Sequence, residues 1–100
     1  MTVKSKKIRN TLVVSIGGEL DHHTSEMIRN QMDNLLEDPT VKNIIVDAEN
    51  LSFMDSSGVG LILGRMRELN AVNGQTIILN PSNTMKKIFQ FSGLSKYVME

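Results

Sequence analysis

The 100-residue sequence contains no cysteine and no tryptophan, and only 4% of its residues are aromatic. Without cysteine the chain can form neither a disulfide nor a thiolate metal site, and it has no cysteine nucleophile. The scarcity of aromatic residues disfavours recognition of bases or sugars by stacking. Charged and hydroxyl side chains are therefore the main candidates for function.

The sequence also lacks an excess of charge of either sign, because its 11 Lys and Arg residues equal its 11 Asp and Glu residues. A balanced surface has no general attraction for phosphate backbones or anionic lipids, so we expect no direct nucleic-acid partner and no membrane partner. No apolar run approaches the ~18 residues of a membrane span, and the first residues lack the apolar core of a signal peptide. We therefore expect a cytoplasmic protein.

With 40% apolar and 22% charged residues, the composition is that of an ordinary globular protein. Neither an internal repeat nor a low-complexity linker interrupts the sequence. The length suffices for one hydrophobic core and not for two, so residues 1–100 are expected to form a single domain.

The patterns of apolar residues predict an α/β fold with the element order ββαβαβα. In chain order we expect strands at 3–8 and 12–16, a helix at 24–36, a strand at 41–48, a helix from 56 to a stop at 73–74, a strand at 75–79 and a helix between 81 and 93, with 97–98 as a further candidate strand. Helical crossovers join parallel strands. We therefore expect a mixed four- to five-stranded sheet with parallel central strands and three or more helices.

Several details of this prediction depend on short patterns. Residues 17–18 are two glycines and are expected to end the second strand, while residues 47–55 are expected to form a loop. The apolar run within 41–48 is continuous, which predicts a strand covered on both faces. In the second helix we expect an inward stripe of apolar residues, namely Val59, Ile62, Leu63, Met66 and Leu69. Methionines at helical offsets are interpreted as core filling, namely Met27, Met32, Met66 and Met85.

The junction between the predicted loop and the second helix carries an unusual set of polar residues. Asp55 is followed by two hydroxyls, Ser56 and Ser57, where the helical pattern begins. We expect Asp55 or Ser56 to cap the helix, because an N-cap side chain accepts a hydrogen bond from a backbone N–H two or three residues on. Capping requires one of these side chains, so a second hydroxyl is left uncommitted.

Three glycines follow within the same predicted helix, at Gly58, Gly60 and Gly64. Each glycine inside a helix costs roughly 0.5–1 kcal/mol relative to alanine. Three of them indicate that another part of the protein, or a partner, comes close to the helix. Internal packing is the better explanation for Gly64, and clearance for a partner's active site is the better one for Gly58.

The junction does not complete a known catalytic or nucleotide motif. The nucleophile elbow G-x-S-x-G lacks its first glycine, since Met54 or Asp55 stands there, and the dinucleotide fingerprint G-x-G-x-x-G fails at Leu63. Only His22 and His23 could serve as a base or as imidazole ligands, and two adjacent histidines rarely bind one metal. We therefore expect no catalytic residue, no metal and no cofactor.

A second polar corner, GELDHHTSE at residues 18–26, joins the second strand to the first helix. One interpretation is a polar loop in which His23 or Thr24 caps the helix, and the other is a recognition surface. If the strands before the two corners are parallel, both corners emerge at the same end of the sheet, where α/β folds place their sites. The candidate partner-binding residues are Glu19, Asp21, His22, His23, Thr24, Asp55, Ser56, Ser57, Gly58 and Gly60.

These two motifs, together with FSGL at 91–94, resemble the STAS-domain anti-sigma-factor antagonists, especially the sporulation type of spore-forming Gram-positive bacteria. The resemblance covers nearly the whole chain. It implies that the unmodified protein binds an anti-sigma factor that is also a serine kinase, and so frees a sigma factor. It further implies that this kinase phosphorylates the serine directly after the aspartate, here Ser56, and that a serine phosphatase reverses the modification.

A phosphate on Ser56 would lie near a helix N-terminus, which tolerates negative charge within the free protein. Beside Asp55, and near Asp21 and Glu19 if the two corners adjoin, it would form an acidic cluster that a partner surface repels. We therefore expect phosphorylation to abolish binding with little effect on the fold.

The sequence departs from the family pattern at two points. Val59 replaces a leucine that is common in the family, and family members commonly continue past the position of Glu100 into another helix, without which some of the sheet would be uncovered.

Two alternative functions are also consistent with the sequence. The first alternative is a phosphocarrier that relays phosphate through His22 or His23. The second is a stress-signalling scaffold whose serine is phosphorylated by a kinase that is not itself an anti-sigma factor.

Overall fold

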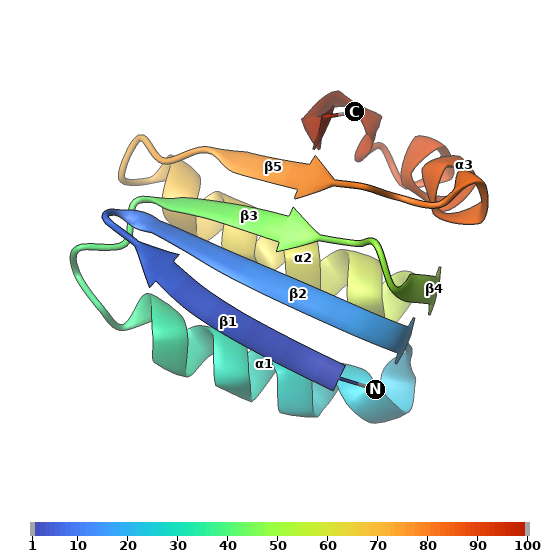
Figure 1. Cartoon of the computed structure of the whole chain (residues 1–100), viewed down its shortest axis with the longest axis horizontal. Helices are drawn as coiled ribbons and strands as arrows, with labels where there is room; N and C mark the ends of the chain where they lie inside the picture. The colour runs from blue at the N-terminus through green and yellow to red at the C-terminus, as the bar shows by residue number, and fades with distance from the viewer. Residues whose placement is uncertain (1, 100) are drawn as a thin grey trace.

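The computed structural model describes residues 2–99, which form six strands in one mixed sheet and three α-helices (Figure 1). The strands are β1 Thr2–Ile8, β2 Thr11–Leu20, β3 Asn43–Asp47, β4 Leu51–Met54, β5 Thr76–Leu79 and β6 Val98–Met99. The helices are α1 His22–Leu36, α2 Ser56–Asn70 and α3 Asn83–Phe91, followed by a short 3₁₀ helix at Ser95–Tyr97. The predicted α/β fold with a mixed sheet is confirmed.

The strands follow the order β1-β2-β3-β5-β6, and β4 pairs with the outer end of β2. Only the β1–β2 pair is antiparallel among the described strands, and it turns at Arg9, whose φ is 55°. The central strands β2, β3 and β5 are parallel, as predicted, because helices provide the crossovers between them.

The strand β2 is longer than predicted and changes its partner along its length. Residues 11–15 pair with β3, whereas residues 18–20 pair with β4 after a register shift between Gly18 and Glu19. Gly18 has a φ of 97°, a conformation that glycine adopts without strain, so the glycines form an irregularity inside the strand and do not end it. The prediction of a strand end at 17–18 was wrong.

The strand β4 lies within residues 47–55, which were predicted as a loop. It has four residues, of which Leu51 and Met54 are buried and the two between them are exposed. Burial at the first and fourth of only four residues does not show the alternation of a strand, so the sequence carried no clear strand signal for β4. Pairing with β2 supplies the order that local sequence does not.

Both α1 and α2 lie on one side of the sheet, behind the strands in Figure 1. Burial along β3 therefore alternates: Ile44 and Val46 are 1% exposed, whereas Ile45 on the opposite face is partly exposed. Its neighbours in register, Val13 and Ile77, are partly exposed as well. The prediction that this strand is covered on both faces was wrong.

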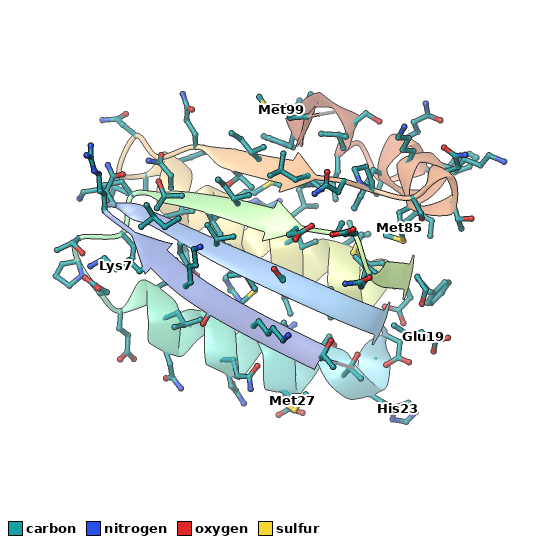
Figure 2. The ribbon with its side chains drawn as sticks, in the orientation of Figure 1. Lys7, Glu19, His23, Met27, Met85 and Met99 are labelled. Carbon is teal, nitrogen blue, oxygen red and sulfur yellow. The ribbon has the colours of Figure 1, made fainter. Side chains whose placement is uncertain are left out.

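The hydrophobic core lies between the sheet and the helices. Met32, Met66 and Met85 are buried in it, as predicted. Met27, by contrast, is 49% exposed, and Figure 2 shows it on the outer side of α1. The buried residues Ile28 and Met32 define the inward face of α1, and Met27 lies about 100° around the helix from Ile28, outside that face.

The inward face of α2 is shifted from the predicted stripe. Its buried residues are Gly58, Leu61, Ile62, Met66 and Leu69, whereas Val59 and Leu63 are partly exposed. The apolar run at 61–63 is continuous, so its phase could not be read from the sequence alone. No helix within residues 2–99 has the length and apolar character needed to cross a membrane.

Candidate functional site

The start of α2 is built around Asp55, which caps the helix. Its Oδ1 accepts hydrogen bonds from the backbone N–H groups of Ser57 at 2.9 Å and Gly58 at 3.2 Å. This agrees with the prediction that Asp55 or Ser56 caps the helix. Ser56 is then the first residue of α2, its side chain is exposed, and its hydroxyl forms no hydrogen bond with any of the described residues.

The start of α1 is capped by Asp21. Its carboxylate accepts hydrogen bonds from the backbone N–H groups of His23 at 2.9 Å and Thr24 at 3.0 Å, while the Thr24 hydroxyl accepts one from the Asp21 N–H at 3.0 Å. The prediction of His23 or Thr24 as the cap was wrong, because the helix begins at His22, two residues earlier than expected. The pKa of Asp21 lies below its usual value, chiefly because the Thr24 N–H donates to the carboxylate.

The two polar corners lie side by side, as predicted. The strands β2 and β4 are parallel with Leu20 in register with Met54, so Asp21 and Asp55 follow adjacent strands at the same end of the sheet. The backbone N–H of Asp55 donates to the carbonyl of Leu20 at 3.3 Å. The backbone N–H of His22 donates to Oδ2 of Asp55 at 3.0 Å, which joins the two helix starts directly.

A polar hollow of about 330 Å³ lies between the first turns of α1 and α2. We call this hollow the polar trough. Its lining residues are His22, Ser25, Glu26, Arg29, Ser56, Ser57 and Gly60. Gly60 contributes by its missing side chain, since no atom lies within 4 Å of the position that a Cβ would take.

A second hollow, of about 350 Å³ and mainly apolar, lies between α2 and α3. We call this hollow the apolar groove. Its lining residues are Met54, Asp55, Ser56, Val59, Ile88, Phe91 and Ser92. Phe91 is 94% exposed, which is unusual for so large an apolar side chain beside a helix end. Ser56 lines both the polar trough and the apolar groove.

Gly58 is buried beneath this surface and does not form part of it. A Cβ at this position would lie 2.5 Å from Cγ of Met54 and 2.7 Å from the carbonyl oxygen of Leu20. Internal packing therefore requires glycine here, and the interpretation of Gly58 as clearance for a partner was wrong. The interpretation of Gly64 was wrong too, because nothing lies within 4 Å of its Cβ position.

Half of the predicted binding residues line the trough or the groove, and the other half do not. Glu19 and His23 are exposed at the same end of the molecule (Figure 2), yet neither lines the trough or the groove. Thr24 is partly buried and donates its hydroxyl to the carbonyl of Glu19 at 2.9 Å.

Sequence reasoning missed several lining residues on α1 and α3. Ser25, Glu26 and Arg29 follow His22 at helical offsets, so the face they share could have been read from the sequence once His22 was known to lie in the helix. Phe91 belongs to the FSGL motif at 91–94 but was not predicted as a binding residue. Its position, two residues after the buried Phe89, is out of phase with the inward face of α3, which was a signal for an exposed aromatic side chain.

The chemistry available at this site is limited to an exposed hydroxyl, a few charges and an apolar surface. Within residues 2–99, no three His, Asp or Glu side chains lie close enough together to hold a metal ion. The rings of His22 and His23 diverge, with centroids 6.2 Å apart and planes at 62°. The arrangement suits the binding of a partner and the modification of Ser56.

Comparison with known proteins gives a consistent family. The STAS domain family matches residues 2–99. The anti-sigma F factor antagonist of Lysinibacillus sphaericus is 59% identical over 92 residues, which cover 92% of this chain and 79% of that protein.

Two solved structures are similar over 98% of this chain. The anti-sigma factor antagonist SpoIIAA in its unphosphorylated form has a TM-score of 0.88 and 52% identity, with 86% of that chain covered. The Bacillus cell fate determinant SpoIIAA in the phosphorylated form has a TM-score of 0.79 and 54% identity, with 89% of that chain covered. The chain therefore belongs to the STAS domain family, in its group of anti-sigma factor antagonists.

Proposed function

We propose that this protein binds an anti-sigma factor that is also a serine kinase, frees the sigma factor, and is switched off by phosphorylation of Ser56. The observation that carries the proposal is the state of the Ser56 side chain. It is exposed, its hydroxyl has no hydrogen-bond partner within residues 2–99, and it lies between the polar trough and the apolar groove. A kinase can reach such a hydroxyl without unfolding the helix, because Asp55 and not Ser56 provides the cap.

The apolar groove is the surface that a partner would cover. Exposed aromatic side chains in a hollow are frequent anchors of protein–protein interfaces, and Phe91 occupies such a position next to Val59 and Ile88. The polar residues on the other side of Ser56 provide a rim that fixes orientation. The predicted binding residues His22, Asp55, Ser56, Ser57 and Gly60 fall within this combined surface.

Phosphorylation of Ser56 would oppose binding by charge. A phosphate adds about −1.5 to −2 charges at neutral pH and would lie next to the carboxylate of Asp55. The N-terminus of α2 tolerates this charge in the free protein. Covering the groove with a partner would remove water from the phosphate, which costs far more than removing it from a serine hydroxyl. The fold is retained, and the partner is released.

We assign no catalytic step to this chain. The Ser56 hydroxyl is the substrate of a partner kinase, and a separate serine phosphatase restores the unmodified form. No cofactor is required for this role, and the protein acts as a regulator in the cytoplasm. The phosphocarrier and scaffold interpretations predict other outcomes of the experiment below.

The experiment is to incubate the protein with the cognate kinase and ATP, map the modified residue, and measure binding before and after. We expect acid-stable phosphoserine at Ser56 and a loss of binding of at least tenfold. Ser56→Ala should bind but accept no phosphate. Ser57→Ala is the matched control, because Ser57 is the adjacent hydroxyl and should leave both phosphorylation and release intact.

Three results would contradict the proposal. Phosphorylation of Ser56→Ala would place the acceptor elsewhere, and acid-labile phosphate on His22 or His23 would indicate a phosphocarrier. A phosphorylating kinase that does not itself bind the sigma factor would indicate a scaffold.

A further inference from the structure

Arg29 lines the polar trough and has no acidic partner. Among residues 2–99, no carboxylate lies within ion-pair distance of its guanidinium group. It projects from the second turn of α1 toward the same hollow as Ser56, which begins α2. An arginine without an ion pair therefore lines the same hollow as a candidate phosphate acceptor.

Two carboxylates lie within one turn of Arg29 on α1. Glu26 lines the same trough without forming an ion pair with Arg29, and Asp33 is paired with another residue. Asp33 lies one turn further along α1, and its carboxylate pairs with Arg65 of α2 at 3.2 Å. Arg65 is only 12% exposed and also pairs with Glu68 at 3.2 Å. The charge of Arg65 is therefore neutralised by two carboxylates, while the charge of Arg29 remains unpaired.

Partial positive charge at the helix starts supports an anion near Ser56. His22 lies in the first turn of α1, and the N-termini of both α1 and α2 add partial positive charge at this end. Glu26 is the carboxylate that lines the trough itself. The carboxylate of Asp55 is turned toward backbone N–H groups, namely those of Ser57, Gly58 and His22.

A phosphate on Ser56 can lie toward either hollow or extend into solvent, because Ser56 is exposed and lines both hollows. Toward α3 it would meet the apolar side chains of Val59, Ile88 and Phe91, which cannot replace its hydration. Toward α1 it would meet the guanidinium of Arg29, whose planar fork matches phosphate oxygens. The difference in solvation and pairing selects the trough.

We propose that Arg29 binds the phosphate of phosphorylated Ser56 within the same molecule, so that the modified side chain is held in the polar trough between α1 and α2. The proposal rests on the proposed function only in taking Ser56 as the phosphate acceptor. The phosphorylated state is then a defined structure with a new contact between the two helices, and Arg29 is the residue that fixes where the charge lies.

The test uses the full chain with phosphoserine incorporated genetically at position 56, so that it does not depend on any kinase. The second pKa of the phosphate is measured by phosphorus NMR at 0.15 M salt, where screening extends over about 8 Å. Contact with a guanidinium favours the dianion, so Arg29→Gln should raise this pKa by about 0.5. The Arg29 Nε–Hε signal should also shift between the unmodified and phosphorylated proteins.

The matched control is Arg67→Gln, which removes the same charge from an exposed position near the C-terminal end of α2, outside the trough. It should leave the phosphate pKa unchanged. Equal effects of Arg29→Gln and Arg67→Gln, or an unmoved Arg29 signal, would overturn the proposal by showing that the phosphate remains in solvent.

The failure of this proposal can be distinguished from the failure of the proposed function. If the phosphoserine protein still binds an anti-sigma factor tightly while Arg29 shows the expected contact, the switch is wrong and the intramolecular contact stands. If binding is lost but the pKa does not respond to Arg29→Gln, the switch stands and the contact is wrong.

Discussion

The backbone N–H of His22 donates a hydrogen bond of 3.0 Å to Oδ2 of Asp55, so the residue that caps α2 also holds the first residue of α1. One carboxylate thus serves two helices, although His22 and Asp55 lie 33 positions apart in the chain. The polar trough lies between these helix starts, so this hydrogen bond joins the two helices that form its walls.

Replacing Asp55 separates its two roles. Asparagine is a good N-cap, but its amide nitrogen cannot accept a hydrogen bond, so Asp55→Asn should keep the cap and lose the bond from His22. Asp55→Ala should lose both and lower the free energy of unfolding by about 1 kcal/mol. Urea unfolding measures the stability, and amide hydrogen exchange at His22 should accelerate in both variants.

The control is Ser82→Ala, which removes the cap of α3, a hydrogen bond of 3.1 Å from the Met85 N–H. It should cost a similar free energy without changing exchange at His22. Unaltered exchange at His22 in Asp55→Ala would show that the bond between the helix starts contributes nothing.

The glycines of α2 should respond in opposite directions to alanine. Gly58→Ala would place a Cβ 2.5 Å from Met54 Cγ and 2.7 Å from the Leu20 carbonyl oxygen, so we expect a loss of about 1–3 kcal/mol through overpacking. Gly64→Ala meets no atom within 4 Å and should stabilise the protein by about 0.5–1 kcal/mol through helix propensity. Thermal denaturation measures both, and equal effects of the two changes would contradict the packing described for Gly58.

Phe91 should matter for binding and not for stability. Its side chain is 94% exposed, so Phe91→Ala removes few contacts within the chain and should change the free energy of unfolding by less than about 0.5 kcal/mol. Loss of an aromatic anchor from the apolar groove should weaken binding of the anti-sigma factor by at least about tenfold. Isothermal titration calorimetry measures the affinity.

The matched control for Phe91 is Val72→Ala, an exposed apolar side chain that does not line the groove. It should bind with unchanged affinity. If Phe91→Ala also binds as tightly as the unaltered protein, the partner does not use the groove.

Acid should destabilise the protein partly through Asp38. A hydrogen bond of 2.8 Å from Nζ of Lys7 is the main cause that holds the pKa of Asp38 well below its usual value, and the Thr40 hydroxyl and backbone N–H add to it. Because the folded pKa is depressed, the stabilisation is present above the unfolded pKa of about 3.9 and is lost as pH falls through the folded value.

The check is the urea midpoint as a function of pH, from 6 downward. Stability of the unaltered protein should fall more steeply below about pH 4 than that of Asp38→Asn, whose side chain does not titrate. The pKa of Asp21 is lowered as well, so some acid sensitivity should persist in the variant. Identical pH profiles would show that the pair of Lys7 and Asp38 does not contribute to folding.

Local sequence was sufficient for most of the fold. The short apolar, β-branched run within β2, the helical offsets of α1 to α3 and the stop signals between them predicted the α/β class and the parallel centre of the sheet. It also identified Asp55 as a candidate cap and left Ser56 or Ser57 as a free hydroxyl. These predictions succeeded because periodicity and capping are decided by residues within a few positions of one another.

Other features could not be predicted, because they depend on contacts between distant segments. Residues 51–54 form a strand because they pair with β2. Position 58 requires glycine because the Leu20 carbonyl of β2 lies close to it. Only one face of β3 is buried, because α1 and α2 both lie on that side of the sheet.

For the site, the sequence by itself determined an exposed serine after an aspartate at a helix start. Only the tertiary structure decided what surrounds that serine. It places α3 with Phe91 on one side of Ser56 and α1 with Arg29 on the other, although these residues lie 35 positions after it and 27 before it. The physical reason is that parallel pairing of β2 with β4 aligns the two helix starts, and no local pattern encodes that alignment.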